Sequence, residues 1–148
     1  MSLAVLVLLL FHLPDFTLQE TDVPEIFKIT NIRHLDEYGF QNYDSHMAIT
    51  HMGTISYQNR NLMAKIFKNK IPLNFVFATL NGDDYIQHAH TTGVQKMGGE
   101  GCSGNLWTPG EMTYIDFNHG TFRPGDRVTF EVYDNTTKQI ISRHTYRA

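Results

Sequence analysis

The chain has 148 residues, 41% of them hydrophobic and 12% aromatic, which is enough for one domain with a core of its own. Charged residues make up 18%, so the composition is too apolar for intrinsic disorder and too polar for a protein with many membrane spans. The formal charge of −3 supplies no basic field, which argues against nucleic-acid binding.

An uninterrupted apolar run, LAVLVLLLF, covers Leu3 to Phe11. A membrane span needs about 20 such residues, and a secretory signal needs a basic start and a small-residue cleavage site. We interpret residues 1–13 as a truncated hydrophobic helix, a short anchor stub; a buried strand or short core helix and a poor signal peptide are the alternatives. The residues assigned to membrane contact or assembly are Leu3, Val5, Leu6, Leu8, Leu9, Leu10 and Phe11.

The next segment, residues 14–24, is polar and bounded by prolines, which indicates a linker. From residue 25 onward, apolar and polar residues alternate in short stretches separated by turn residues. Strands are expected near residues 26–32, 46–50, 62–67, 73–80, 112–117, 128–132 and 139–146. No convincing amphipathic helix follows residue 16, and residues 91–105, which hold five glycines, are expected to form a loop. This pattern predicts a mostly-β, Ig-like antiparallel β-sandwich over residues 25–148.

The unit Pro-Gly-acid occurs twice, at Pro109-Gly110-Glu111 and at Pro124-Gly125-Asp126. Proline sets a φ near −65° for the first central position of a turn, and glycine supplies a positive φ at the second, so both units predict type II turns. The acid that follows can accept hydrogen bonds from nearby amides.

His88 and His90 form the best metal-like cluster, because an i, i+2 pair in a strand faces one side. Asp83, Asp84 and His119 are further candidate ligands only if the fold brings them close. A solvated loop is the simpler interpretation, and no metal is assigned.

Other candidate residues are single. Cys102, the only cysteine, excludes an intramolecular disulfide and is interpreted as a loop thiol in preference to a nucleophile. Asn135 begins an Asn-Thr-Thr sequence in an expected turn and is predicted as a glycosylation site, with an ordinary turn as the alternative. Trp107 is interpreted as an inter-sheet core residue in preference to a sugar-stacking platform. The paired carboxylates Asp36 and Glu37 sit in a turn sequence, where acids are common.

Several segments resemble the globular domain of archaeal type IV pilin-like proteins: GCSGNLWTPGEMTYIDF, GTFRPGDRVTFEVYD, KQIISRHTYRA, ITNIRHLDEYG and THMGTISYQNRNLMAKIFKN. The likeness covers roughly residues 26–148. It implies an apolar N-terminal helix that bundles with sister helices, β-sandwich domains that form an outer sheath and are often glycosylated, and neither cofactor nor catalysis. This chain departs from the family pattern because the leader, its cleavage site and the first half of the helix are not in the sequence.

Three hypotheses follow. The first is a structural cell-surface protein, a subunit of an archaeal type IV pilus-like filament or a membrane-anchored surface module, which self-assembles through the apolar N-terminal segment and requires no cofactor. Exposed aromatic residues are expected at subunit contacts, or else in ordinary packing: Tyr38, Phe40, Tyr43 and Tyr57. The second is an extracellular module that binds carbohydrate or a metal. The third, an enzyme using Cys102, has the weakest support, and we expect no catalytic activity.

Overall fold

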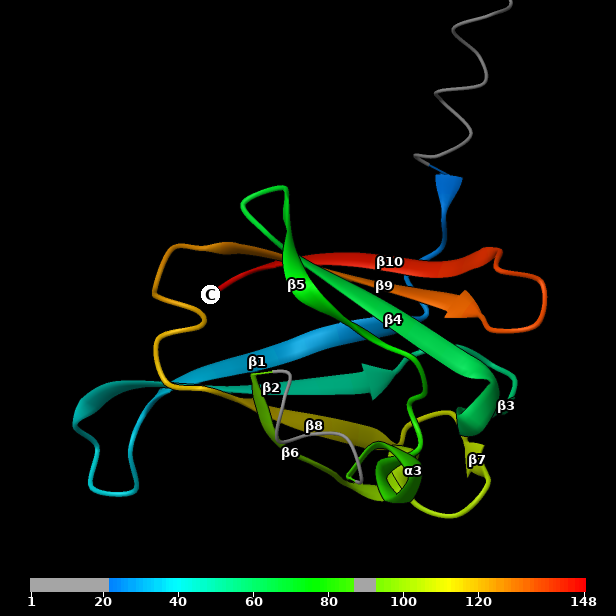
Figure 1. Ribbon diagram of the computed structural model, residues 1–148, viewed down its shortest axis with the longest axis horizontal. Helices are drawn as coiled ribbons and strands as arrows, with labels where there is room; N and C mark the ends of the chain where they lie inside the picture. Colours follow the sequence, from blue (N-terminus) through cyan, green and yellow to red (C-terminus); the bar gives the residue numbers. More distant parts are fainter. Residues whose placement is uncertain (1–21, 87–92) are drawn as a thin grey trace, which may run out of the picture.

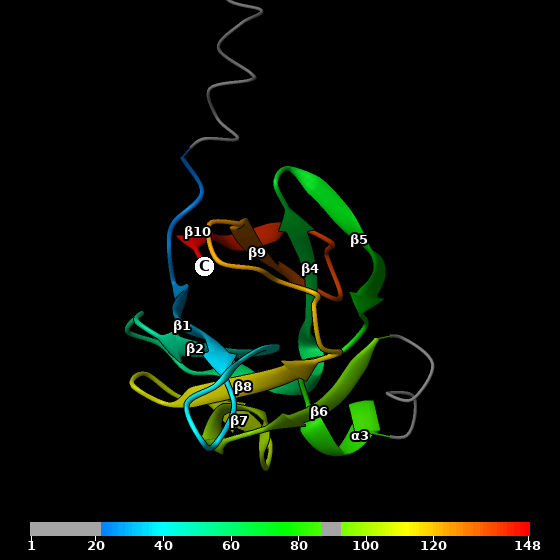
Figure 2. The same ribbon diagram turned by 90° about the vertical axis from the view of Figure 1, so that its left-hand side faces the viewer.

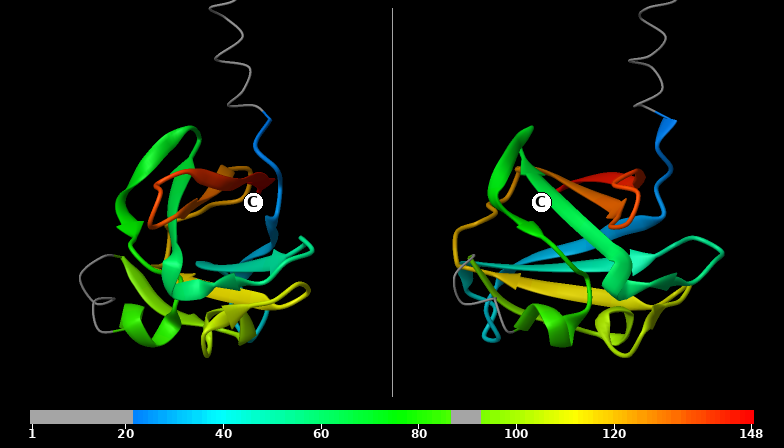
Figure 3. Two further views of the ribbon diagram at one scale, coloured as in Figure 1. Left: turned by 90° about the vertical axis from the view of Figure 1, so that its right-hand side faces the viewer. Right: turned by 45° about the vertical axis from the view of Figure 1, so that its right-hand side comes forward.

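The computed structural model describes residues 22–86 and 93–148, which form two antiparallel sheets packed face to face (Figure 1). In spatial order the first sheet contains β1 (Phe27–Leu35), β2 (Gln41–His51), β8 (Met112–Phe117) and β6 (Val94–Gly98). The second contains β10 (Ile140–Arg147), β9 (Arg127–Asp134), β4 (Leu62–Lys68) and β5 (Ile71–Phe77). The predicted mostly-β, Ig-like sandwich is confirmed, and the views in Figure 3 show the same two layers.

Short elements complete the described chain. β3 (Tyr57–Gln58) and β7 (Leu106–Trp107) form a two-stranded ribbon, and η2 (Asn59–Asn61) and η4 (Glu100–Cys102) are single 3-10 turns. The five-residue helix α3 (Gly82–Ile86) lies beside β6 (Figure 2). We expected no helix here, but Asn81 provides a cap: its Oδ1 accepts hydrogen bonds from the N–H groups of Asp83 and Asp84, each at 3.1 Å.

The interpretation of residues 91–105 as a loop is wrong, because β6 and η4 lie within it. Val94 and Met97 of β6 are 2% and 3% exposed, so this strand contributes to the core. Gly98 is needed within the strand because the ring of Tyr114 on β8 occupies the space that a Cβ would fill. Gly98 and Gly101 therefore serve close packing, whereas Gly93, Gly99 and Gly104 adopt positive φ values.

The core lies between the sheets and is rich in aromatic side chains. Phe27 of β1 packs on Trp107 of β7, with ring centroids 4.5 Å apart, and Phe117 packs on Phe122 at 5.0 Å. The largest fully buried side chains are Trp107, Phe27, Phe77, Phe117, Phe122, Phe130, Met47, Ile49, Leu62, Ile66, Leu80 and Ile115. They come from both sheets, as the predicted alternation requires.

Side chains of β10 join the two sheets along one edge. The buried Ser142 hydroxyl accepts the backbone N–H of Ile26 at 3.0 Å and of Phe27 at 2.9 Å, and His144 Nδ1 accepts the N–H of Ile29 at 3.0 Å. Backbone N–H groups on the edge of β1 therefore find their hydrogen-bond acceptors in the opposite sheet.

Both Pro-Gly-acid units form the predicted turns. Gly110 has a φ of 86° and Gly125 a φ of 92°, and in each turn the acid's N–H bonds back three residues, at 3.1 Å. Each acid's side chain also accepts the N–H of the first turn residue: Glu111 from Thr108 at 2.7 Å, and Asp126 from Arg123 at 2.9 Å. The N–H of Thr108 lowers the pKa of Glu111. Burial acts to raise the pKa of Asp126, but the N–H of Arg123 and the Asn69 amide lower it overall.

Candidate functional site

The β1–β2 hairpin is the most prominent exposed feature and reaches beyond the rest of the first sheet (Figure 1). It ends in a turn that Asp36 closes. The carboxylate Oδ1 of Asp36 accepts the N–H groups of Tyr38 at 2.9 Å and of Phe40 at 2.8 Å, and Gly39 adopts a φ of 84°. We call residues 35–40 the hairpin tip.

The tip exposes large apolar side chains. Tyr38 is 78% exposed, Phe40 72% and Leu35 47%. Four aromatic residues were proposed for subunit contacts, and two of them, Tyr38 and Phe40, project from the tip into solvent. A third, Tyr57, packs on Phe27 with ring centroids 5.5 Å apart. Tyr43 lies under the Arg123 guanidinium, 4.9 Å from the ring centroid.

An irregular segment of β2 sets the tip off from the sheet. Arg33 pairs with His46 and Leu35 with Gln41, so β1 advances two residues while β2 advances five. Tyr43 and Ser45 have positive φ values of 54° and 58° there. Such a bulge bends the strand and redirects the side chains beyond it.

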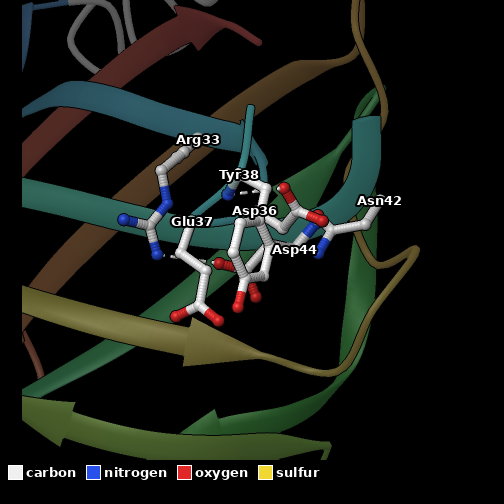
Figure 4. Close-up of a pocket in the computed structure, with 6 residues that line it drawn as sticks. All are labelled: Arg33, Asp36, Glu37, Tyr38, Asn42 and Asp44. Carbon is white, nitrogen blue, oxygen red and sulfur yellow. Dashed lines mark hydrogen bonds and ion pairs between the residues drawn. The ribbon is translucent and has the colours of Figure 1, made fainter. Parts of the chain in front are cut away.

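A polar hollow of about 410 Å³ lies in this bend, and Figure 4 shows its lining residues, Arg33, Asp36, Glu37, Tyr38, Asn42 and Asp44. Arg33 donates to Asp44 at 2.9 Å, and His119 Nε2 lies 3.3 Å from the other oxygen of Asp44. Among residues 22–86 and 93–148, Asp36 and Glu37 form no such salt bridge, so the tip side of the hollow carries negative charge. Sequence reasoning missed Asp44, because its partners Arg33 and His119 come from β1 and from the loop after β8.

The metal candidates are not brought together in the described chain. His88 and His90 lie outside the described residues. Asp84 is paired with Arg60 at 2.7 Å, and His119 is paired with Asp44 at the hairpin. Within residues 22–86 and 93–148, no group of three or more His, Cys, Asp or Glu side chains is placed to hold a metal ion.

Cys102 and Trp107 are both core residues. Cys102 is 2% exposed in η4, and burial raises the pKa of its thiol, the opposite of the shift that activates a nucleophile. Trp107 is fully buried and donates its indole N–H to the Glu111 carbonyl at 2.9 Å. The core interpretation of Trp107 is confirmed, and its ring offers no exposed face for a sugar.

Asn135 lies in the turn between β9 and β10. Its backbone N–H donates to the carbonyl of Asn61 at 2.7 Å, and its side-chain oxygen accepts from Lys138 at 2.5 Å. Thr136 and Thr137 beside it are exposed. Glycosylation of Asn135 stays a prediction.

The anchor residues Leu3, Val5, Leu6, Leu8, Leu9, Leu10 and Phe11 lie outside the described residues, as does most of the expected linker. In the part of the chain that the structure describes, no helix has the length and apolar character needed to cross a membrane. The assignments of residues 1–13 and 14–24 therefore stay predictions.

The fold defines the chain as an antiparallel β-sandwich protein with exposed apolar side chains on a projecting hairpin. No protein-family model matches the chain, and no curated protein matches its sequence. A solved complex of the archaellum periplasmic stator proteins FlaF and FlaG from Sulfolobus acidocaldarius matches with 9% identity and a TM-score of 0.46, covering 88% of this chain and 94% of that chain. FlaG from the same organism matches with 8% identity and a TM-score of 0.45, covering 82% and 97%. Both matches are archaellum stator proteins. The pilin resemblance drawn from the sequence stays a prediction.

Proposed function

We propose that this protein is a structural component of an archaeal cell surface, either a subunit of a pilus-like filament or a membrane-anchored surface module. The observation that carries the proposal is the hairpin tip, where Tyr38 and Phe40 are 78% and 72% exposed. Large aromatic side chains on a projecting turn are characteristic of surfaces that bind other proteins. The candidate nucleophile Cys102, by contrast, is buried with a raised pKa, which gives the enzyme hypothesis no support.

The apolar run Leu3–Phe11 supplies the attachment in this proposal. Burial of aliphatic surface contributes about 25 cal/mol per Å², so the run favours either lipid or the apolar face of sister segments. The sandwich then stands outside the membrane, with Asn135 available to the glycosylation machinery.

The test is cell fractionation of an archaeal host that expresses the full chain. We expect the protein to be found in the envelope fraction. We also expect protease added to intact cells to digest it. Charges placed in the apolar run, Leu6→Asp with Leu9→Asp, should release it from the membrane. The matched control Leu35→Asp adds a charge to the exposed hairpin and should leave attachment unchanged.

A second readout is independent of attachment. Asn135→Gln should abolish a glycan-dependent shift in electrophoretic mobility, because glycosylation takes place outside the cytosol. A full chain that stays in the cytosolic fraction, protected from added protease, contradicts the proposal.

A further inference from the structure

The end of the sandwich that bears the hairpin also bears a cluster of cations. We call it the basic end, and its residues are Lys68, Lys70, Arg123, Arg127 and Arg147. Three hydrogen-bonded connections bring them together. The N–H of Asn69 donates to the Arg127 carbonyl at 2.8 Å, Arg127 is paired with Arg147 across β9 and β10, and Lys68 Nζ donates to the Thr121 carbonyl at 3.2 Å.

Figure 2 views the molecule from this end, with the turn after β4 and the strands β9 and β10 in the upper half and the hairpin in the lower half. Lys70, Arg123, Arg127 and Arg147 are exposed. Among residues 22–86 and 93–148, none of these four forms a salt bridge with a carboxylate. The carboxylate of Asp126 lies among them and accepts the N–H of Arg123 and the side-chain amide of Asn69. The cations outnumber this carboxylate, so the basic end is a positively charged surface.

The hairpin tip has the opposite character. Asp36 and Glu37 form no salt bridge within the described chain, and the tip's one nearby cation, Arg33, is already held by Asp44. The exposed rings of Tyr38 and Phe40 lie beside these acids. Acidic and aromatic groups together favour an arginine-rich partner surface, because a guanidinium both pairs with carboxylates and stacks on rings. The same chain shows this contact internally, where Arg123 stacks on Tyr43.

We infer that the partner of the hairpin tip is the basic end of a second copy of this chain. Because the two complementary surfaces lie at the same end of the molecule, one two-fold axis lets each hairpin tip contact the basic end of the other copy. The product is a closed, end-to-end dimer with two identical contacts. This inference rests on the proposed assembly role for the choice of partner, but it does not require the membrane segment.

The test compares charge reversals on the two surfaces by sedimentation equilibrium. All proteins are full-length and carry Leu6→Asp and Leu9→Asp, so that association through the apolar run does not contribute. Glu37→Lys replaces one of the two acids of the hairpin tip with a cation and cancels the tip's net charge, and Arg127→Glu with Arg147→Glu places two acids among the three remaining cations of the basic end. Each variant alone should raise the dimer dissociation constant at least about tenfold, since it removes attractive charge pairs from both contacts and places an introduced charge opposite charges of the same sign.

An equimolar mixture of the two variants should dimerise more tightly than either variant alone. In the mixed dimer one contact is the unaltered one, and in the other the introduced lysine faces the two introduced glutamates. Added NaCl should weaken the parent dimer. Glu100→Lys, an exposed reversal on η4, is the matched control and should have no effect.

A parent protein that is monomeric at about 100 µM, well above the affinity range of specific complexes, overturns the inference. So does a mixture that associates no more tightly than either variant alone. A loss of association in the arginine variant without a loss in Glu37→Lys also overturns it, because the basic end would then contact a surface other than the hairpin tip. None of these outcomes bears on the fractionation of the unaltered chain, so failure of the dimer and failure of the surface role are distinguishable.

Discussion

Gly101 and Gly125 are both required to be glycine, but for different physical reasons. A Cβ on Gly101 would lie 2.5 Å from Trp107 Nε1 and would also strike Thr113 Oγ1, so the constraint is packing. Gly125 has open space around it and a φ of 92°, so the constraint is backbone conformation.

We therefore predict unequal costs for the same substitution. Gly101→Ala should lower the free energy of unfolding by about 3 kcal/mol, because the buried indole has to move. Gly125→Ala should lower it by only about 1 kcal/mol, the usual penalty for a left-handed non-glycine residue. Urea denaturation measures both, and Gly110→Ala, in the equivalent turn, is the control that should match Gly125→Ala. Equal losses at Gly101 and Gly125 would contradict this account.

Residue chemistry was predictable from the sequence where it is local. The back-bonding of Glu111 and Asp126 depends on residues three positions away, and turn chemistry specifies it. The roles of Cys102 and Asp44 were not predictable to the same degree, because burial and ion pairing depend on segments that only the fold brings together.

The β4–β5 hairpin shows how a single element depends on its turn. Asn69 and Lys70 have φ values of 52° and 69°, which is the conformation of a type I′ turn. Asn69 tolerates it and ties the turn to β9, accepting from the Arg127 N–H at 2.9 Å. Lys70 has a Cβ that disfavours this conformation.

Lys70→Gly should therefore raise the free energy of unfolding by about 1 kcal/mol, since Asn-Gly is the preferred type I′ sequence. Lys70→Ala removes the same long side chain but keeps the Cβ, and it should leave stability nearly unchanged. Thermal and urea unfolding of the pair separate the backbone effect from any effect of the charge. A gain in the alanine variant equal to that in the glycine variant would assign the effect to the side chain.

Elements with strict alternation were the easiest to predict. β8 buries alternate residues and lies where it was predicted. β9 also covers its predicted position, but its alternation is interrupted at Glu131, which is buried between Phe130 and Val132. β6 was not predicted, because Gly98 and its neighbours have low strand propensity. The strand forms because tertiary packing against β8 outweighs that propensity. β5 begins at Ile71, two residues before the expected position, because the turn before it is short.

At the scale of the whole molecule, the sandwich could be predicted but its strand order could not. The contact of β1 with β10 joins residues more than 110 positions apart, and no local pattern specifies it. The same holds for the hairpin tip and the basic end, which become one end of the molecule only after both sheets are assembled. Composition and periodicity set the number of layers, whereas long-range hydrogen bonds set which edges meet.

His144 makes the contact between β1 and β10 sensitive to pH. Its Nδ1 accepts the Ile29 N–H, which requires that nitrogen to be unprotonated. Burial lowers the pKa of His144; the charge of Glu25 acts to raise it and that of Lys28 to lower it. A proton on the ring would therefore oppose the contact between the sheets.

The sign of the effect follows from linkage. Above the ordinary histidine pKa of 6.5, His144 is neutral in both the folded and the unfolded chain, so it adds no pH dependence. As pH falls below 6.5, the unfolded chain takes up a proton that the folded chain resists, and stability is lost until the pH reaches the lower folded pKa.

His144→Asn keeps an acceptor oxygen near the position of Nδ1 without titrating. Between pH 7.5 and 5.5 this variant should lose less free energy of unfolding than the wild type, whereas between pH 8.5 and 7.5 the two should change in parallel. Equal losses in the acidic interval would mean that the contact between β1 and β10 does not depend on the protonation of His144.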